Sequence, residues 1–231
     1  MSALRANEQT GAGKASLKDA LGNACFRFRA ISVVPVLLVI LFFCRPLDLG
    51  RCNSWLSVLG LAVALAGALT RIVAVGFSKP STSGRENYLK AEHLNTSGLY
   101  SIVRNPLYVG NFLIYNGVLL AYASPAGLLL FNLFFVPNYY FIIHSEERYL
   151  EKQFGDEYRA YLKAVPRILP RFSLYRKNDY PFSTVKAVIR ERGTTLYWVF
   201  FYALVLLLKQ YWLGDGAIRH FWWHAVPVLA L

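Results

Sequence analysis

The side chains with the clearest chemical potential include two adjacent carboxylates. Glu146 and Glu147 stand where an apolar stretch gives way to charged sequence. Carboxylates at a membrane boundary are costly unless they meet water, a cation or a hydrogen-bond donor. Two interpretations are open. The pair belongs either to a solvated helix face, neutralised by Arg148 and Lys152, or to a site for a cationic or ribose-bearing ligand.

A second group is the polar motif 104–110, which reads Arg-Asn-Pro-Leu-Tyr-Val-Gly. Pro106 suits the first turn of a helix, where its missing N–H is no loss. We expect the free N–H groups of residues 107–109 to form a small site for a negative group such as a carboxylate. Gly110 and Gly117 permit close approach of a helix or a ligand.

Polar side chains recur along the same predicted helix at about helical spacing, so they share one face: Asn105, Tyr108, Asn111 and Tyr115. For Arg104, Asn105 and Tyr108 we favour a functional role. Hydrogen bonding between helices is the structural alternative. For Asn116, Asn132 and Asn138, hydrogen bonding between helices is a sufficient explanation.

The motifs follow one another in a characteristic order. The chain reads Gly-x-Tyr at 98–100, Arg-x-Pro-x-Tyr-x-Gly at 104–110, Glu-Glu-x-x-Leu at 146–150, Phe-Gly-x-x-Tyr at 154–158, and then Tyr161 and a proline-containing segment. This order closely resembles the isoprenylcysteine carboxyl methyltransferase family and the related membrane phospholipid methyltransferases. The resemblance covers residues 94–172, about a third of the chain.

The resemblance implies an all-helical membrane enzyme that uses S-adenosylmethionine to methylate a lipid or lipid-anchored acceptor. It implies catalytic roles for Arg104, Asn105 and Tyr108. Implied cofactor-binding residues are Gly98, Tyr100, Arg104, Pro106, Tyr108, Gly110, Glu146 and Glu147. Tyr158 and Tyr161 match a helix that covers the site.

Asn105 departs from the family pattern, which usually has His before this proline. If that His presents only its backbone, Asn serves equally well, whereas a role for the ring would mean different chemistry here. Methyl transfer from a sulfonium is a displacement that needs alignment more than acid–base groups. We expect no metal cluster, because the four His are scattered along the chain. No Gly-x-Gly-x-x-Gly follows a strand, so a dinucleotide site is not indicated.

The elements that must position these groups are membrane helices. The chain has 231 residues, of which 55% are hydrophobic and 16% charged, against about 25% charged in soluble domains. Apolar stretches of roughly spanning length lie at 28–44, 54–76, 106–123, 128–143 and 194–213, with a shorter one at 217–231. We predict an all-α transmembrane bundle of five to six spans. Ser124-Pro125-Ala126-Gly127 is a turn signal that makes 106–143 a helical hairpin.

Composition divides the chain into a mobile tail (1–24), N-terminal helices with a loop (25–93), a methyltransferase-like core with a cytoplasmic cofactor pocket (94–172), and a C-terminal basic segment with helices (173–231). The net charge is +12. Twenty-one Lys and Arg fall on one predicted side of the membrane and four on the other. This asymmetry indicates a cytoplasmic N-terminus and active site and contact with anionic lipid rather than nucleic acid. The membrane would be the inner membrane in a bacterium, or the endoplasmic reticulum in a eukaryote.

Two other functions compete with methyl transfer: an NADPH-dependent reductase of the sterol type, and a lipid-binding protein without catalysis. Among acceptors we rank a phospholipid-type headgroup at least level with a prenylcysteine carboxyl. Cys44 and Cys52 form a disulfide only if their loop faces an oxidising compartment.

Overall fold

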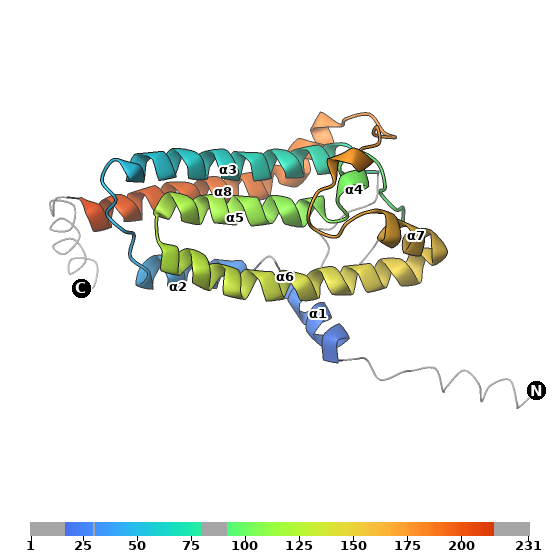
Figure 1. Ribbon diagram of the computed structural model, residues 1–231, viewed down its shortest axis with the longest axis horizontal. Helices are drawn as coiled ribbons and strands as arrows, with labels where there is room; N and C mark the ends of the chain where they lie inside the picture. The colour runs from blue at the N-terminus through green and yellow to red at the C-terminus, as the bar shows by residue number, and fades with distance from the viewer. Residues whose placement is uncertain (1–16, 30, 80–91, 215–231) are drawn as a thin grey trace, which may run out of the picture.

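The computed structural model describes residues 17–29, 31–79 and 92–214, which form helices and connecting loops with no strand among them (Figure 1). The helices are α1 (Leu17–Phe28), α2 (Val33–Phe43), α3 (Cys52–Gly76), α4 (Leu99–Ile102), α5 (Pro106–Tyr122), α6 (Pro125–Phe154), α7 (Asp156–Ala164), the 3-10 turn η1 (Phe172–Leu174) and α8 (Thr184–Leu213). α3, α5 and α8 pack together, and α6 lies along α5 with α1 and α2 beside it. The predicted all-helical class is confirmed.

Three described helices, α3, α6 and α8, are long and apolar enough to cross a membrane, and the bent pair α1–α2 raises the number to four if it counts as one span. α5 has 17 residues and at 1.5 Å per residue reaches about 25 Å. The apolar stretch 217–231 lies outside the described residues.

The closest helix contact joins α3 to α5 through small residues. A Cβ added to Gly60 would meet the Gly117 carbonyl oxygen at 2.4 Å, and one added to Gly67 would meet the Gly110 carbonyl oxygen at 2.5 Å. The two backbones therefore touch, as small residues permit at membrane helix interfaces. The expectation that Gly110 and Gly117 allow close approach is confirmed.

The predicted first span, 28–44, is not one straight helix. α1 and α2 meet at 74° across the break between Phe28 and Val33, and Pro35 lies in the first turn of α2. α1 also begins inside the segment assigned to the tail. It packs on α6, where a Cβ on Gly22 would meet the Phe141 carbonyl oxygen at 2.9 Å and the Ser145 hydroxyl donates to the Asn23 side-chain oxygen at 2.6 Å.

The hairpin of α5 and α6 is confirmed, with its turn at the predicted place. Ala123 adopts a left-handed conformation, and the Ser124 hydroxyl accepts from the Gly127 N–H. α6 continues to Phe154 instead of ending at 143, so Glu146 and Glu147 lie on the same helix as the apolar residues. α8 starts at Thr184, ten residues before the predicted span, because its polar first turns pack against the end of α3.

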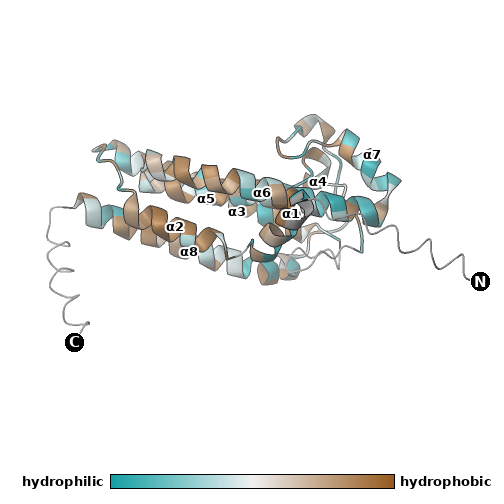
Figure 2. Ribbon diagram, turned by 90° about the horizontal axis from the view of Figure 1, so that it is seen from below, coloured by the Kyte–Doolittle hydropathy of each residue, from teal (hydrophilic) through white to brown (hydrophobic). Residues whose placement is uncertain are grey.

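Hydrophilic residues gather at one end of the bundle, which we call the polar end: α4, the start of α5, α6 beyond Ile143, α7 and residues 165–183. The helices between this end and the opposite one are mostly hydrophobic (Figure 2). The two polar segments predicted to share one side of the membrane are residues 77–105 and 144–193, and their described parts lie together at this end.

Candidate active site

The N-terminus of α5 is closed by its own cap residue. Pro106 is the first helical residue, as predicted, but the N–H groups of Tyr108 and Val109 both donate to the Asn105 carbonyl oxygen at 3.1 Å. These two donors are therefore not free. The expected anion site at residues 107–109 is not formed in this structure.

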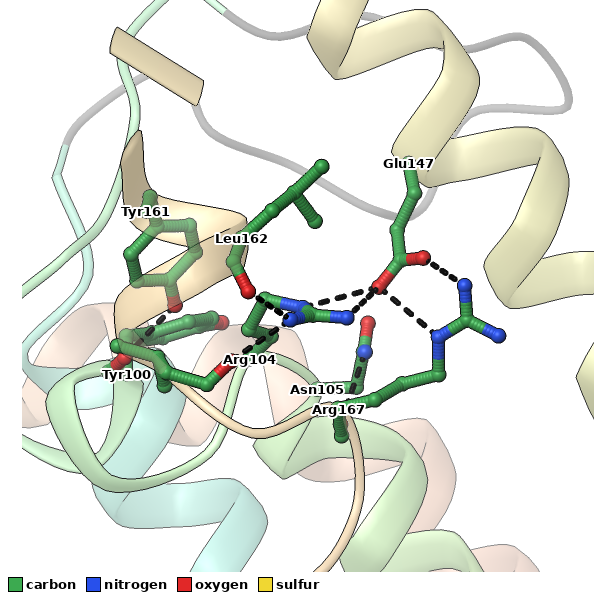
Figure 3. Close-up of polar contacts among 8 residues, drawn as sticks. Tyr100, Arg104, Asn105, Glu147, Tyr161, Leu162 and Arg167 are labelled. Carbon is green, nitrogen blue, oxygen red and sulfur yellow. Dashed lines mark hydrogen bonds and ion pairs between the residues drawn. The ribbon is translucent and has the colours of Figure 1, made fainter. Parts of the chain in front are cut away.

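The centre of the polar end is the Glu147 carboxylate, held between two arginines (Figure 3). Glu147 Oε1 accepts from Arg104 Nε at 3.1 Å and lies 3.0 Å from the second Arg104 nitrogen. Arg167 contacts both carboxylate oxygens. The Glu147 and Arg104 side chains are only 8% and 11% exposed, whereas Arg167 is 36% exposed. Arg167 is thus the partner that solvent or a ligand can reach.

Most guanidinium N–H groups of Arg104 are taken up by acceptors of the protein itself. Its remaining terminal nitrogen donates to the carbonyl oxygens of Leu162 at 2.8 Å and Val165 at 2.7 Å (Figure 3). Its backbone N–H donates to Pro166 O at 2.9 Å. Arg104 therefore joins the start of α5 to the end of α7.

Asn105 makes a related contact. Its side-chain nitrogen donates to the Arg167 carbonyl oxygen at 3.0 Å. In this structure Asn105 thus supports the loop that carries Arg167. The contact needs a donor at this position but no acid–base group.

Helix α7 covers the site with two buried tyrosines. Tyr158 and Tyr161 pack with Leu94 and Val165 in a small apolar cluster. Burial raises the pKa of the Tyr161 hydroxyl, so this hydroxyl stays protonated and donates to the Tyr100 carbonyl oxygen at 2.7 Å. Tyr161 therefore joins α7 to α4.

Gly98 is required by the backbone geometry at the start of α4. Its φ is +59°, a conformation that side chains disfavour. It pairs with Arg176, whose carbonyl oxygen accepts from the Gly98 N–H at 2.9 Å. A Cβ here would lie 1.7 Å from the Asn178 side-chain oxygen. The Gly-x-Tyr motif thus docks the segment before α8 onto the site.

Glu146 points to a second cluster, on the α5 side of α6. Its carboxylate interacts with the Tyr108 hydroxyl. The Tyr108 ring packs edge-on against Tyr139, with 5.2 Å between ring centroids. The Tyr139 ring stacks in turn on Phe135 at 3.9 Å. An aromatic column therefore leads from Glu146 into the apolar part of the bundle.

The hairpin and α7 bring most residues predicted for the cofactor pocket to the polar end: Gly98, Tyr100, Arg104, Pro106, Tyr108, Glu146 and Glu147. Gly110 is the exception, because it packs against Gly67 and Arg71 of α3. Three further charged residues that form ion pairs with largely buried partners were not predicted: Arg167, which pairs with Glu147, and Arg71 and Glu191, which pair with each other. Arg167 lies in the proline-containing segment that ends the motif order, which reads Val-Pro-Arg-Ile-Leu-Pro at 165–170, so its sequence signal was present. Arg71 is the one charged residue between Cys52 and Gly76, a signal that points to a buried partner.

Similarity to known proteins agrees with this geometry. The profile of the phospholipid methyltransferase family matches residues 55–157. The cobalt-zinc-cadmium resistance protein CzcN of Cupriavidus metallidurans is 34% identical over 165 residues, covering 70% of this chain and 73% of the relative. Protein-S-isoprenylcysteine O-methyltransferase B of Arabidopsis thaliana is 29% identical over 164 residues, covering 69% of this chain and 81% of the relative.

Methanethiol S-methyltransferase 2 of Bradyrhizobium diazoefficiens is 28% identical over 171 residues, covering 68% of this chain and 64% of the relative. No solved structure matches the chain. The family profile and these relatives, together with the apolar helices, make the chain an integral membrane methyltransferase. The chain belongs to the phospholipid methyltransferase family, which the motif order predicted together with its isoprenylcysteine branch. Membership implies S-adenosylmethionine as methyl donor.

Proposed function

We propose that this methyltransferase binds S-adenosylmethionine at the polar end and methylates a lipid or lipid-anchored acceptor that reaches the site from the bilayer. The observation that carries the proposal is the Glu147 carboxylate between Arg104 and the half-exposed Arg167. When bound, the cofactor supplies a methyl group on a positively charged sulfur. Its amino-acid end carries both an ammonium and a carboxylate.

The charged groups of the polar end fit such a zwitterion. Glu147 offers a carboxylate for an ammonium group. Arg167 offers a planar guanidinium, which suits a carboxylate. Arg104 is held by two carbonyl oxygens besides Glu147, so its role is to orient Glu147. Glu146 and Tyr108 lie nearby as acceptor and donor for hydroxyl groups such as those of a ribose.

The catalytic contribution of the chain is then alignment. Displacement at a methyl group needs the nucleophile, the carbon and the leaving sulfur in line, and positioning alone lowers a barrier by several kcal/mol. Arg104 and Asn105 fix the loop that carries Arg167, and Tyr161 fixes α7 over the site. In this proposal Gly98, Tyr100 and Pro106 shape the pocket through their backbones.

The proposed acceptor class follows from the surface of the segment 165–183. Four apolar or aromatic side chains within eight residues are exposed there: Ile168, Leu169, Phe172 and Tyr175. Basic residues alternate with them: Arg167, Arg171, Arg176 and Lys177. Apolar and basic side chains mixed in this way suit the headgroup region of an anionic bilayer, where each nearby cation contributes about 1 kcal/mol. The site thus adjoins a surface suited to lipid.

The decisive experiment incubates the purified protein in vesicles with methyl-labelled cofactor and three acceptor pools in parallel. The pools are total membrane lipid, a prenylcysteine analogue and small thiols. We expect label in lipid, with phospholipid at least level with prenylcysteine. Label confined to the small thiols would defeat the lipid acceptor. A melting temperature raised by NADPH and unchanged by S-adenosylhomocysteine would favour the reductase alternative.

A further inference from the structure

A buried ion pair lies between helices α3 and α8. Arg71 and Glu191 form a two-point contact, with Nε to Oε2 at 2.8 Å and a terminal nitrogen to Oε1 at 2.9 Å. Their side chains are 13% and 6% exposed. Each lies five to seven residues from the end of its helix that faces the polar end. Charges at such depth are costly and mark function by default.

The guanidinium of Arg71 reaches beyond this pair to α5. Its other terminal nitrogen donates to the Asn111 side-chain oxygen at 2.8 Å and to the Leu107 carbonyl oxygen at 3.4 Å. The Arg71 stem passes over Gly110, where an added Cβ would lie 2.5 Å from Arg71 Cγ. Because Gly110, the last residue of the Arg-x-Pro-x-Tyr-x-Gly motif, has no side chain, Arg71 can pack directly against α5.

Asn111 connects Arg71 to helix α6. Because Arg71 occupies its oxygen, Asn111 presents its side-chain nitrogen to the Tyr139 hydroxyl at 3.0 Å. The Tyr139 ring packs against Tyr108, which interacts with Glu146. A continuous series of contacts thus runs from Glu191 on α8 to the proposed pocket.

We infer that Arg71 and Glu191 are positioning residues for the methyl-transfer site, acting through Asn111 and Tyr139 on Tyr108 and Glu146. The inference rests on the proposed function of the polar end. It assigns a part in the site to α8, which lies outside the residues 55–157 matched by the family profile. A purely structural ion pair would hold α3 to α8 without affecting Tyr139.

The test separates these two roles by removing both charges together. Removing one partner would leave an uncompensated buried charge, whereas replacing a buried pair by apolar residues often preserves stability. We expect the double variant R71M/E191L to keep a melting temperature near that of the wild type. Its affinity for S-adenosylhomocysteine should fall. Its kcat/KM should drop by up to about 100-fold, because a small misplacement of reacting groups has an effect of this size.

Two single variants complete the design. Tyr139→Phe removes only the hydroxyl that Asn111 contacts and should lower both quantities in the same direction. Tyr202→Phe is the matched control, since its hydroxyl also joins α8 to α3, at 2.6 Å from the Ser57 carbonyl oxygen. That contact lies toward the opposite end of the bundle, so Tyr202→Phe should leave both quantities unchanged.

The outcomes distinguish this inference from the proposed function. If the folded R71M/E191L protein keeps wild-type affinity and kcat/KM, the inference is overturned and the proposed function is not. If the double variant fails to fold, unaltered affinity and kcat/KM in Tyr139→Phe would overturn it instead. A wild-type protein that is folded but does not bind S-adenosylhomocysteine would overturn the proposed function and the inference with it.

Discussion

At the scale of single residues, the Glu147 carboxylate is the centre of the polar end. It contacts Arg104 and Arg167 from different segments, so its charge bears on both the loop geometry and the proposed pocket. Charge-assisted hydrogen bonds of this kind are roughly twice as strong as neutral ones. Removing the charge while keeping the shape separates these two contributions.

We expect Glu147→Gln to weaken S-adenosylhomocysteine binding at least about tenfold, which corresponds to about 1.4 kcal/mol. The variant should be less stable, because the buried Arg104 charge is left uncompensated, but it should still fold, because Arg104 keeps its bonds to two carbonyl oxygens. Calorimetric titration in detergent measures the effect. Glu151→Gln is the control, since its pair with Arg159 is largely exposed and such pairs contribute little. Equal affinity in both variants would return Glu147 to a structural role.

Two glycines near the site offer a matched comparison of backbone strain. Gly98 and Gly155 have φ values of +59° and +55°. A Cβ on Gly98 would collide with Asn178, whereas one on Gly155 would meet nothing within 4 Å. Gly155→Ala should therefore cost only conformational strain, about 1–3 kcal/mol.

Gly98→Ala carries the same strain and also displaces the segment that contains Arg176 and Asn178. We expect it to lower the melting temperature further than Gly155→Ala and to reduce methyl transfer. Thermal unfolding and the labelled-methyl assay measure both effects. The same melting temperature in the two variants would show that the contact with Asn178 has no energetic weight.

At the scale of helices, sequence patterns predicted most of the architecture. The turn at Ser124, the start of α5 at Pro106 and the course of α3 follow from local chemistry. The patterns failed where tertiary contacts decide. α8 begins ten residues early because its polar first turns contact α3, and Arg71 in α3 pairs with Glu191 from 120 residues away.

The candidate site was predictable to a similar degree. The motifs that flank the predicted hairpin placed Glu147, Tyr108 and Gly98 at its open end. The hydrogen bonds from Arg104 to the carbonyl oxygens of Leu162 and Val165 were not predictable, because they depend on where the chain turns back after α7. The anion site expected at residues 107–109 was wrong because the Asn105 carbonyl oxygen accepts from two of its three donors.

The contact between α3 and α5 predicts a sensitive position. Gly67→Ala would place a methyl group 2.5 Å from the Gly110 carbonyl oxygen and 2.8 Å from the Ile114 nitrogen. Both atoms belong to the backbone, so we expect a loss of about 1–3 kcal/mol from overpacking. Ala66→Val adds bulk on an exposed position of the same helix and should be tolerated. Melting in detergent compares the two, and similar values would contradict the close packing.

At the scale of the whole molecule, the placement of charge predicts orientation. All three cysteines are free, and Cys52 is exposed at the first turn of α3, at the end of the bundle away from the polar end. If the polar end is cytoplasmic, as the basic residues indicate, Cys52 faces the other side. A membrane-impermeant maleimide should then label intact vesicles or cells, and Cys52→Ser should abolish the label. Labelling that requires permeabilisation would indicate the opposite orientation.

Helix α6 is unbroken from Pro125 to Phe154 and bears lipid-accessible Leu129 toward one end and Glu147 toward the other. Eighteen residues of helix separate the two, or about 27 Å. The helix fixes this spacing along its own axis, so only tilting or a kink at Pro137 changes the depth of the site, whereas the level of the headgroups moves with acyl length. Hydrophobic mismatch would therefore offset a lipid's reactive group from the site. We expect methylation to peak at one acyl length in a series of vesicles of graded thickness, with cofactor affinity constant across the series. A flat profile would mean that the acceptor does not approach at a depth set by the bilayer.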